Sequence, residues 1–260
     1  MNMEEGSSVV ERRAPVSWIA LYSALLGATS IVPVFPYVGG GGYWPLSLPL
    51  AAIAPFILGF PGAVLSAFIG GLIGWVLSPA AYPLGIVDVI LTGTMPAIAV
   101  GLVMNANDMK YYVATILLYI SQIITINLVP YYIPGPAGGF DTAPQPLYFM
   151  LFLPTWLPWL IILLTPIGFR TLPRLIREGT GVKRFVALYF TIIIGMFLWW
   201  MPWEYPYWYI YKYPVTLTIA TVSVYLIWIP VFCLIITIIA VPILEGLRRS
   251  GLPKVAGAIW

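Results

Sequence analysis

Histidine is absent from the 260-residue sequence, and cysteine occurs once, at Cys233. Without histidine the chain lacks the ligands of the usual zinc and haem sites, and it cannot form a Ser-His-Asp triad. A single cysteine excludes a disulfide within the chain and gives no information about the redox compartment. We therefore expect no enzyme activity, no catalytic residues, no metal site and no cofactor.

Charged residues are also scarce. They make up 8% of the chain, against about 25% in a typical soluble domain. Hydrophobic residues make up 61%, and the mean hydropathy is +0.95, which excludes a soluble globule. The net charge of +3 is too small to indicate nucleic-acid binding. The composition predicts an all-α polytopic protein of the cell membrane, with the lipid bilayer as its surroundings.

Eight apolar runs predict membrane-spanning helices. Their approximate bounds are residues 16–35, 48–59, 62–78, 85–104, 111–131, 147–168, 184–203 and 214–244. The stretch 48–78 has two interpretations: one long crossing, or two short helices joined by the turn Gly59-Phe60-Pro61-Gly62.

The positions of the basic residues favour the second interpretation. Lysine and arginine cluster at 12–13, 110, 170–184 and 248–254, whereas residues 36–48, 79–84 and 132–146 contain none. If residues 48–78 turn back once, all basic clusters lie on one side, as the positive-inside rule requires. A re-entrant hairpin would give the same sidedness and stays open. We predict about eight spans, with both termini in the cytoplasm.

Two aromatic segments are expected on the outer side. Residues 203–213 are expected to form an outer loop. They are rich in Trp and Tyr, which indicates either a girdle at the membrane interface or a surface that stacks on a flat solute. The four glycines Gly39–Gly42 precede Tyr43 and Trp44 and predict either a lid over a pocket or a flexible connector. No lysine follows them, so this loop is not a phosphate-binding loop.

Few polar residues fall within the predicted spans. Asp88 is the only charged residue clearly inside one, where it either contacts a ligand or caps a helix. Asn127 and Gln122 in the fifth span, with Thr92 and Thr94 in the fourth, either line a polar cavity or pair with other helices.

Small residues recur at helical spacing in two places. Ala20, Ala24 and Ala28 form one stripe, and Gly62, Ser66, Gly70 and Gly74 form another. Such stripes allow close helix packing, within this chain or against a partner.

Residues 1–168 resemble the substrate-binding S component of energy-coupling-factor (ECF) vitamin transporters. The Ala20-x-x-x-Ala24-x-x-x-Ala28 series is similar to the docking motif in the first helix of that family. The passage from Pro45 through Gly62-Ala63 is similar to the family's short helix and turn, and the Gly/Ala-rich helix Ala63–Leu77 follows it. The resemblance implies a six-helix bundle over 1–168, to which 169–260 add a C-terminal helical pair.

The resemblance also implies a function. An S component captures a vitamin-like solute from outside and docks on a transmembrane T component, with two cytoplasmic ATPases supplying energy. Docking would use Ala20, Ala24 and Ala28. By this analogy the pocket would lie between the 37–44 loop and the outer ends of the fourth to sixth spans. Topology and polarity then predict the substrate-binding residues Tyr37, Tyr43, Trp44, Asp88 and Asn127. A non-catalytic structural or assembly subunit of another membrane complex is the alternative.

Overall fold

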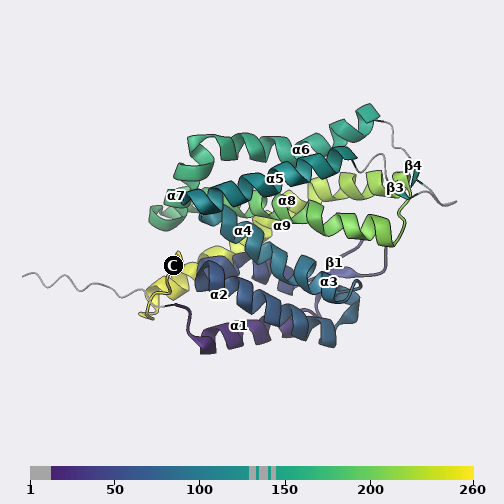
Figure 1. The fold of residues 1–260 in the computed structure, drawn as a ribbon. Coiled ribbons are helices and arrows are strands. Elements are labelled where there is room, and N and C mark those ends of the chain that lie inside the picture. Colours follow the sequence, from purple (N-terminus) through teal and green to yellow (C-terminus); the bar gives the residue numbers. More distant parts are fainter. Residues whose placement is uncertain (1–12, 129–132, 135–139, 142–144) are drawn as a thin grey trace, which may run out of the picture.

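The computed structural model describes residues 13–260 except 129–132, 135–139 and 142–144. Side chains are described for residues 13–125 and 150–260. The protein is nearly all-α, with 79% of it helical. Most helices lie roughly side by side in Figure 1. Two short β-hairpins lie at one end of the bundle, and α7 and the C-terminus lie at the other.

The elements follow one another with short connections. They are α1 (Val16–Thr29), β1 (Pro33–Pro36), β2 (Tyr43–Pro45), α2 (Ser47–Leu77), α3 (Ile86–Asp88), α4 (Met95–Met104), α5 (Met109–Leu128), β3 (Ile133–Pro134), β4 (Phe140–Asp141), α6 (Gln145–Leu164), α7 (Leu172–Glu178), α8 (Gly181–Ile210) and α9 (Val215–Arg249). Single turns of 3₁₀-helix (Pro79–Ala81) and π-helix (Val89–Thr94 and Ile167–Thr171) complete the described part.

Several helices are long and apolar enough to cross a membrane. By length and composition four described segments qualify: α2, Ile86–Met104, α8 and α9. Met150–Leu164 and Ile167–Glu178 qualify together, although they meet at an angle of 74°. The fold is therefore that of an α-helical membrane protein.

Helix α2 is broken at Gly59, within the predicted turn. Gly59 has φ 67° and ψ 169°, a backbone conformation that only glycine adopts readily. Both ends of α2 lie at the same end of the molecule, because Ser30 Oγ is 3.0 Å from Ser47 Oγ and 3.1 Å from Tyr82 Oη. The two halves of α2 therefore form a helical hairpin. The first half, at about 1.5 Å per residue, is only about 18 Å long.

The C-terminal segment binds two backbone carbonyls beside the break. Pro61 has no N–H to donate to the Ile57 carbonyl, which instead accepts a hydrogen bond from Trp260 Nε1 at 2.9 Å. The Phe56 carbonyl accepts one from the Ile259 N–H at 3.0 Å. The end of the chain is thereby fixed against the kink in α2.

We expect Gly59→Ala to lower the free energy of unfolding by about 2–4 kcal/mol, because the new Cβ meets both a strained backbone and the Ala256 carbonyl. Gly246→Ala is the matched control, since nothing lies near its Cβ within α9. Thermal unfolding of the purified protein in detergent measures both. Equal midpoints for the two variants would contradict the argument.

Helix α8 continues well past the predicted end of its span. Residues 203–210 are helical, and Trp203, Glu204 and Tyr207 are buried, so the prediction of an outer loop over 203–213 was wrong. The interfacial-girdle interpretation was also wrong for these buried residues. Only Tyr211–Pro214 connect α8 to α9.

Helix α8 also lies within the main hydrophobic core. Tyr119 Oη donates to the Ile194 carbonyl at 2.7 Å, and Trp199 Nε1 donates to the Leu91 carbonyl at 2.6 Å. One buried core includes residues from both sides of position 168. The segment 169–260 therefore contributes to the centre of the bundle.

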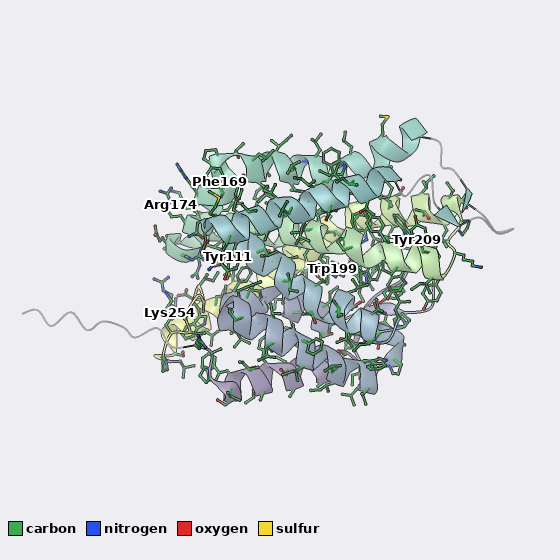
Figure 2. All side chains as sticks on the ribbon, in the orientation of Figure 1. Tyr111, Phe169, Arg174, Trp199, Tyr209 and Lys254 are labelled. Atoms are coloured by element: carbon green, nitrogen blue, oxygen red, sulfur yellow. The ribbon has the colours of Figure 1, made fainter. Side chains whose placement is uncertain are left out.

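The basic residues gather at one end of the bundle, here called the basic end. Arg174 and Lys254 lie there, at the end that carries α7 and the C-terminus (Figure 2). Arg177 and Arg184 donate hydrogen bonds to the end of α4 and to the C-terminal segment, which places them at the same end. The opposite end, here called the hairpin end, carries β1 and β2. Among the described lysines and arginines, Lys212 alone lies there.

The two small-residue stripes face different surroundings. The second packs against α1: a Cβ at Gly70 would meet Leu26, and Ser23 Oγ donates to the Ser66 carbonyl at 3.1 Å. Ala20, Ala24 and Ala28 are exposed on the other face of α1. That face has no close partner among the described residues.

Candidate functional site

The β1–β2 hairpin brings the first predicted site residues together. The strands pair antiparallel, with Phe35 opposite Trp44 and Pro36 opposite Tyr43. The turn contains Gly40 and Gly41, both with positive φ and with no neighbour near a Cβ. Glycine therefore allows the tight return of the chain.

Trp44 is fully buried at the centre of an aromatic cluster. Its ring stacks on Tyr225 of α9 with centroids 4.9 Å apart and planes at 6°. Trp199 and Trp203 of α8 meet it edge-on at 5.4 and 5.9 Å. Rings arranged in this way gain dispersion and quadrupole energy beyond simple burial. Trp44 thereby holds the hairpin on α8 and α9.

Tyr43 points to a different neighbourhood. Its hydroxyl lies 2.6 Å from Ser78 Oγ and donates to the Ser30 carbonyl at 3.1 Å. It connects the ends of α1 and α2, and it does not line the cavity described below.

Asp88 is completely buried, with several hydrogen-bond donors around its carboxylate. Oδ2 accepts from the Leu84 N–H at 2.7 Å, and Oδ1 accepts from Thr92 Oγ1 at 3.2 Å. Tyr207 Oη of α8 lies 2.8 Å from both oxygens and 3.4 Å from Tyr37 Oη. The carboxylate therefore joins the start of the 86–104 segment to α8, and Tyr207 extends the contact to Tyr37 of the hairpin.

A second buried carboxyl belongs to Glu204, which sequence reasoning placed in a loop. Glu204 is 1% exposed. Oε1 accepts from Trp208 Nε1 at 3.1 Å. Oε2 accepts no hydrogen bond from the described residues. The indole of Trp200 is nearby, and the N–H of that indole is also unpaired. A buried polar atom without a partner is costly, and a functional role is one reason for a protein to retain it.

Glu204 lines a small cavity at the hairpin end. The other lining residues come from the hairpin, α8, α9 and their connection: Tyr37, Val38, Gly39, Trp203, Tyr207, Tyr213, Thr221 and Tyr225. The cavity holds about 10 Å³, roughly the space of one water molecule. Its wall thus combines aromatic rings, phenol hydroxyls and one incompletely paired carboxyl.

Two phenols that line the cavity from outside the helices, Tyr37 and Tyr213, remain protonated. Burial, reinforced by the nearby Glu204 carboxyl, raises the pKa of Tyr213 to about 12. Burial, followed by the negative charge of Asp88, raises the pKa of Tyr37 well above its ordinary value. Both hydroxyls are therefore neutral hydrogen-bond donors at physiological pH.

Of the predicted site residues, Tyr37 lines the cavity. Trp44 and Asp88 contact residues that line it, whereas Tyr43 does not take part, and the side chain of Asn127 lies outside the described residues. The predicted outer ends of the fourth to sixth spans do not line this cavity in the described structure; α8 and α9 do. One signal in the sequence could have shown that α8 continues to the site. It is the helical spacing of residues 200, 203, 204, 207 and 208.

The described residues contain no group of three or more His, Cys, Asp and Glu side chains that could hold a metal ion. Comparisons with protein-family models, curated proteins and solved structures give no match to this chain.

Proposed function

We propose that this chain is the substrate-capture subunit of an ATP-driven importer in the cell membrane. It binds a vitamin-like small molecule from outside and docks on a transmembrane T component that carries two cytoplasmic ATPases. The observation that carries the proposal is the Glu204 carboxyl, which is buried and incompletely paired in an aromatic cavity at the hairpin end. Buried polar groups in a concave aromatic site are typical of ligand binding.

The proposed topology follows from the charges. The basic end faces the cytoplasm under the positive-inside rule, and the cavity then faces outside. If each half of α2 crosses the membrane once, the chain has eight crossings and both termini lie in the cytoplasm. The bundle then consists of six S-component-like helices and a C-terminal pair.

The proposed solute carries a positive charge or several hydrogen-bond donors. Asp88 and Glu204 are both buried near the cavity, and no described lysine or arginine is buried beside them. A cationic solute over Tyr and Trp faces would also gain cation–π attraction. Since drug-sized ligands need about 300 Å³ or more, the Gly39–Gly42 turn must let the hairpin move outward when solute enters.

An assembly subunit of another membrane complex is the second candidate. The small cavity volume favours it, because an assembly subunit needs no solute. The exposed alanine stripe fits either function.

Ala24→Trp separates the two candidates. We expect it to abolish recovery of a multi-spanning partner and ATPases in a mild-detergent pull-down, because the indole fills the docking face. Solute that copurifies with the chain should stay at the wild-type level. Ala220→Trp on α9 is the matched control, since Ala220 is also an exposed helical alanine.

A stable complex without any ATPase, unaffected by either tryptophan, would support the assembly subunit. Loss of bound solute in Ala24→Trp would contradict the assignment of this face to docking alone.

A further inference from the structure

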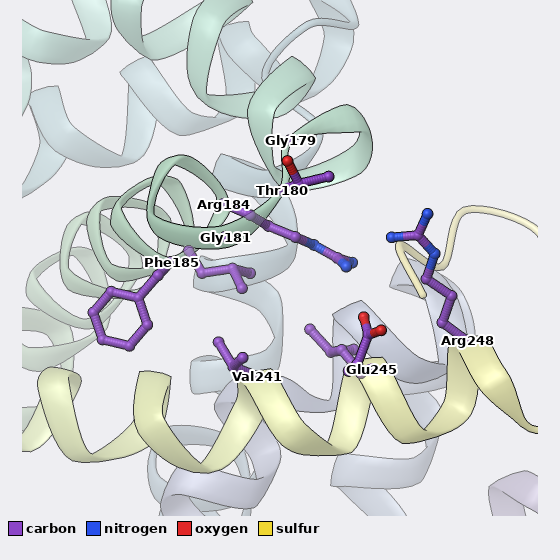
Figure 3. Close-up of a pocket in the computed structure, with 10 residues that line it drawn as sticks. Gly179, Thr180, Gly181, Arg184, Phe185, Val241, Glu245 and Arg248 are labelled. Atoms are coloured by element: carbon purple, nitrogen blue, oxygen red, sulfur yellow. The ribbon is translucent and has the colours of Figure 1, made fainter.

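A second cavity lies at the basic end, between the start of α8 and the last turns of α9. It holds about 310 Å³. Figure 3 shows the Arg184 side chain extending from α8 across it, with Arg248 and Glu245 on the facing turns of α9. None of these residues lines the aromatic cavity at the hairpin end.

Arg184 is held rigidly in this cavity. It is only 9% exposed, and it donates from Nε to the Ile176 carbonyl at 3.1 Å and from Nη2 to the Ile259 carbonyl at 2.6 Å. A guanidinium has five N–H donors, so these two bonds leave others for a ligand. Neutral carbonyls do not balance its charge.

The opposite wall adds a second guanidinium. Arg248 is exposed, and in Figure 3 its head group is on the same side of the cavity as that of Arg184. Glu245 is the acidic residue in the wall, and it already accepts a hydrogen bond from Arg249 Nε at 2.8 Å. Two arginines therefore face the cavity against one carboxylate that is already paired.

Apart from Thr180 and two glycines, the rest of the wall is apolar. Phe185 and Leu188 on α8 and Val241 on α9 also line the cavity, and in Figure 3 Phe185 and Val241 lie on the side of Arg184 away from Arg248. Leu188 is four residues after Arg184 and Val241 is four residues before Glu245, so polar and apolar groups share one face of each helix. A free inorganic anion would gain nothing from the apolar part, whereas a lipid would place its acyl chain there.

We propose that this cavity binds an anionic membrane phospholipid, with the phosphate between Arg184 and Arg248 and the acyl chain along Phe185 and Val241. Arginine matches phosphate oxygens with paired N–H donors, and basic cavities between membrane helices suit such head groups. The first turn of α8, whose N–H groups have no helical partners, begins beside the same cavity at Gly181 and adds positive potential.

The test uses the full chain in detergent with equal amounts of dioleoyl phosphatidylglycerol and dioleoyl phosphatidylcholine. Native mass spectrometry measures which lipid is retained. We expect the wild type to prefer phosphatidylglycerol, and Arg248→Gln to weaken that retention about fivefold. Arg174→Gln removes the same charge from an exposed position at the same end and should change little. Glu245→Gln should strengthen retention, which a merely unfolded variant could not do.

Equal retention of the two lipids by the wild type would overturn the proposal, as would equal losses in Arg248→Gln and Arg174→Gln. Inorganic phosphate is added in a separate arm. Displacement of phosphatidylglycerol by millimolar phosphate would show that the cavity recognises a free anion, and this would overturn the lipid assignment.

Discussion

Asp88→Ala is expected to lower the free energy of unfolding by about 3–5 kcal/mol, because it leaves several buried donors without an acceptor. The Leu84 N–H, the Thr92 hydroxyl and the Tyr207 hydroxyl all point to this carboxylate. Asp88 is completely buried, so these donors lose their acceptor away from bulk water. Thermal unfolding in detergent measures the loss.

Asp108→Ala is the control for this prediction. Asp108 is exposed in the turn before α5, where it pairs with Lys110 at 3.4 Å. An exposed ion pair contributes little, but Asp108 Oδ1 also accepts a hydrogen bond from the Lys110 N–H at 3.1 Å in the first turn of α5. We therefore expect a loss of about 1 kcal/mol, well below that of Asp88→Ala. A double-mutant cycle with Tyr207→Phe then isolates the bond between Asp88 and α8. A stable Asp88→Ala variant with no coupling to Tyr207 would show that this bond does not hold the helices together.

The geometry of Asp88 also refines its expected effect on solute. Its oxygens are occupied by the chain's own donors, and it does not line the cavity. Asp88→Asn should therefore weaken binding of a cationic or hydrogen-bond-donating solute through displacement of Tyr207 and Tyr37. Unchanged affinity would remove Asp88 from the site.

The helical character and the break in α2 could be predicted because local chemistry determines them. Runs of apolar residues favour helices in a membrane. The helix breaks where Gly59 adopts a non-helical backbone conformation and Pro61 lacks an N–H donor. What satisfies the freed Ile57 carbonyl could not be predicted. Trp260 comes from 203 residues away, and nothing in its local sequence indicates that contact.

The end of α8 could not be predicted for the same reason. Pro202 and Pro206 and the many aromatic residues favour a loop at the membrane interface. In the structure, however, Trp203 Nε1 donates to Thr92 Oγ1 at 2.9 Å, and Tyr207 bonds Asp88. These tertiary contacts stabilise helix where local preference is weak. The predicted site therefore contained Tyr37 and Asp88 but lacked Glu204. Glu204 lies between Trp203 and Tyr207 on α8 and is buried with them.

Glu204→Gln is expected to abolish solute capture and to leave the fold intact. Glutamine keeps an oxygen for Trp208 Nε1 and nearly the same side-chain size, so we expect stability to change by less than about 1 kcal/mol. If the solute carries a positive charge or donates hydrogen bonds to Oε2, its affinity should fall about a hundredfold, since removal of one partner of a buried charged contact costs about 2–5 kcal/mol.

Mass spectrometry of small molecules that copurify with the chain measures the loss, and thermal unfolding measures the fold. Glu178→Gln, an exposed glutamate at the end of α7, is the control and should retain the wild-type amount of solute. The same solute in equal amounts from all three proteins would exclude the Glu204 carboxyl from the binding site. A clear loss of stability in Glu204→Gln, with no solute in any of the three, would instead make Glu204 a structural partner of Trp208 and favour the assembly subunit.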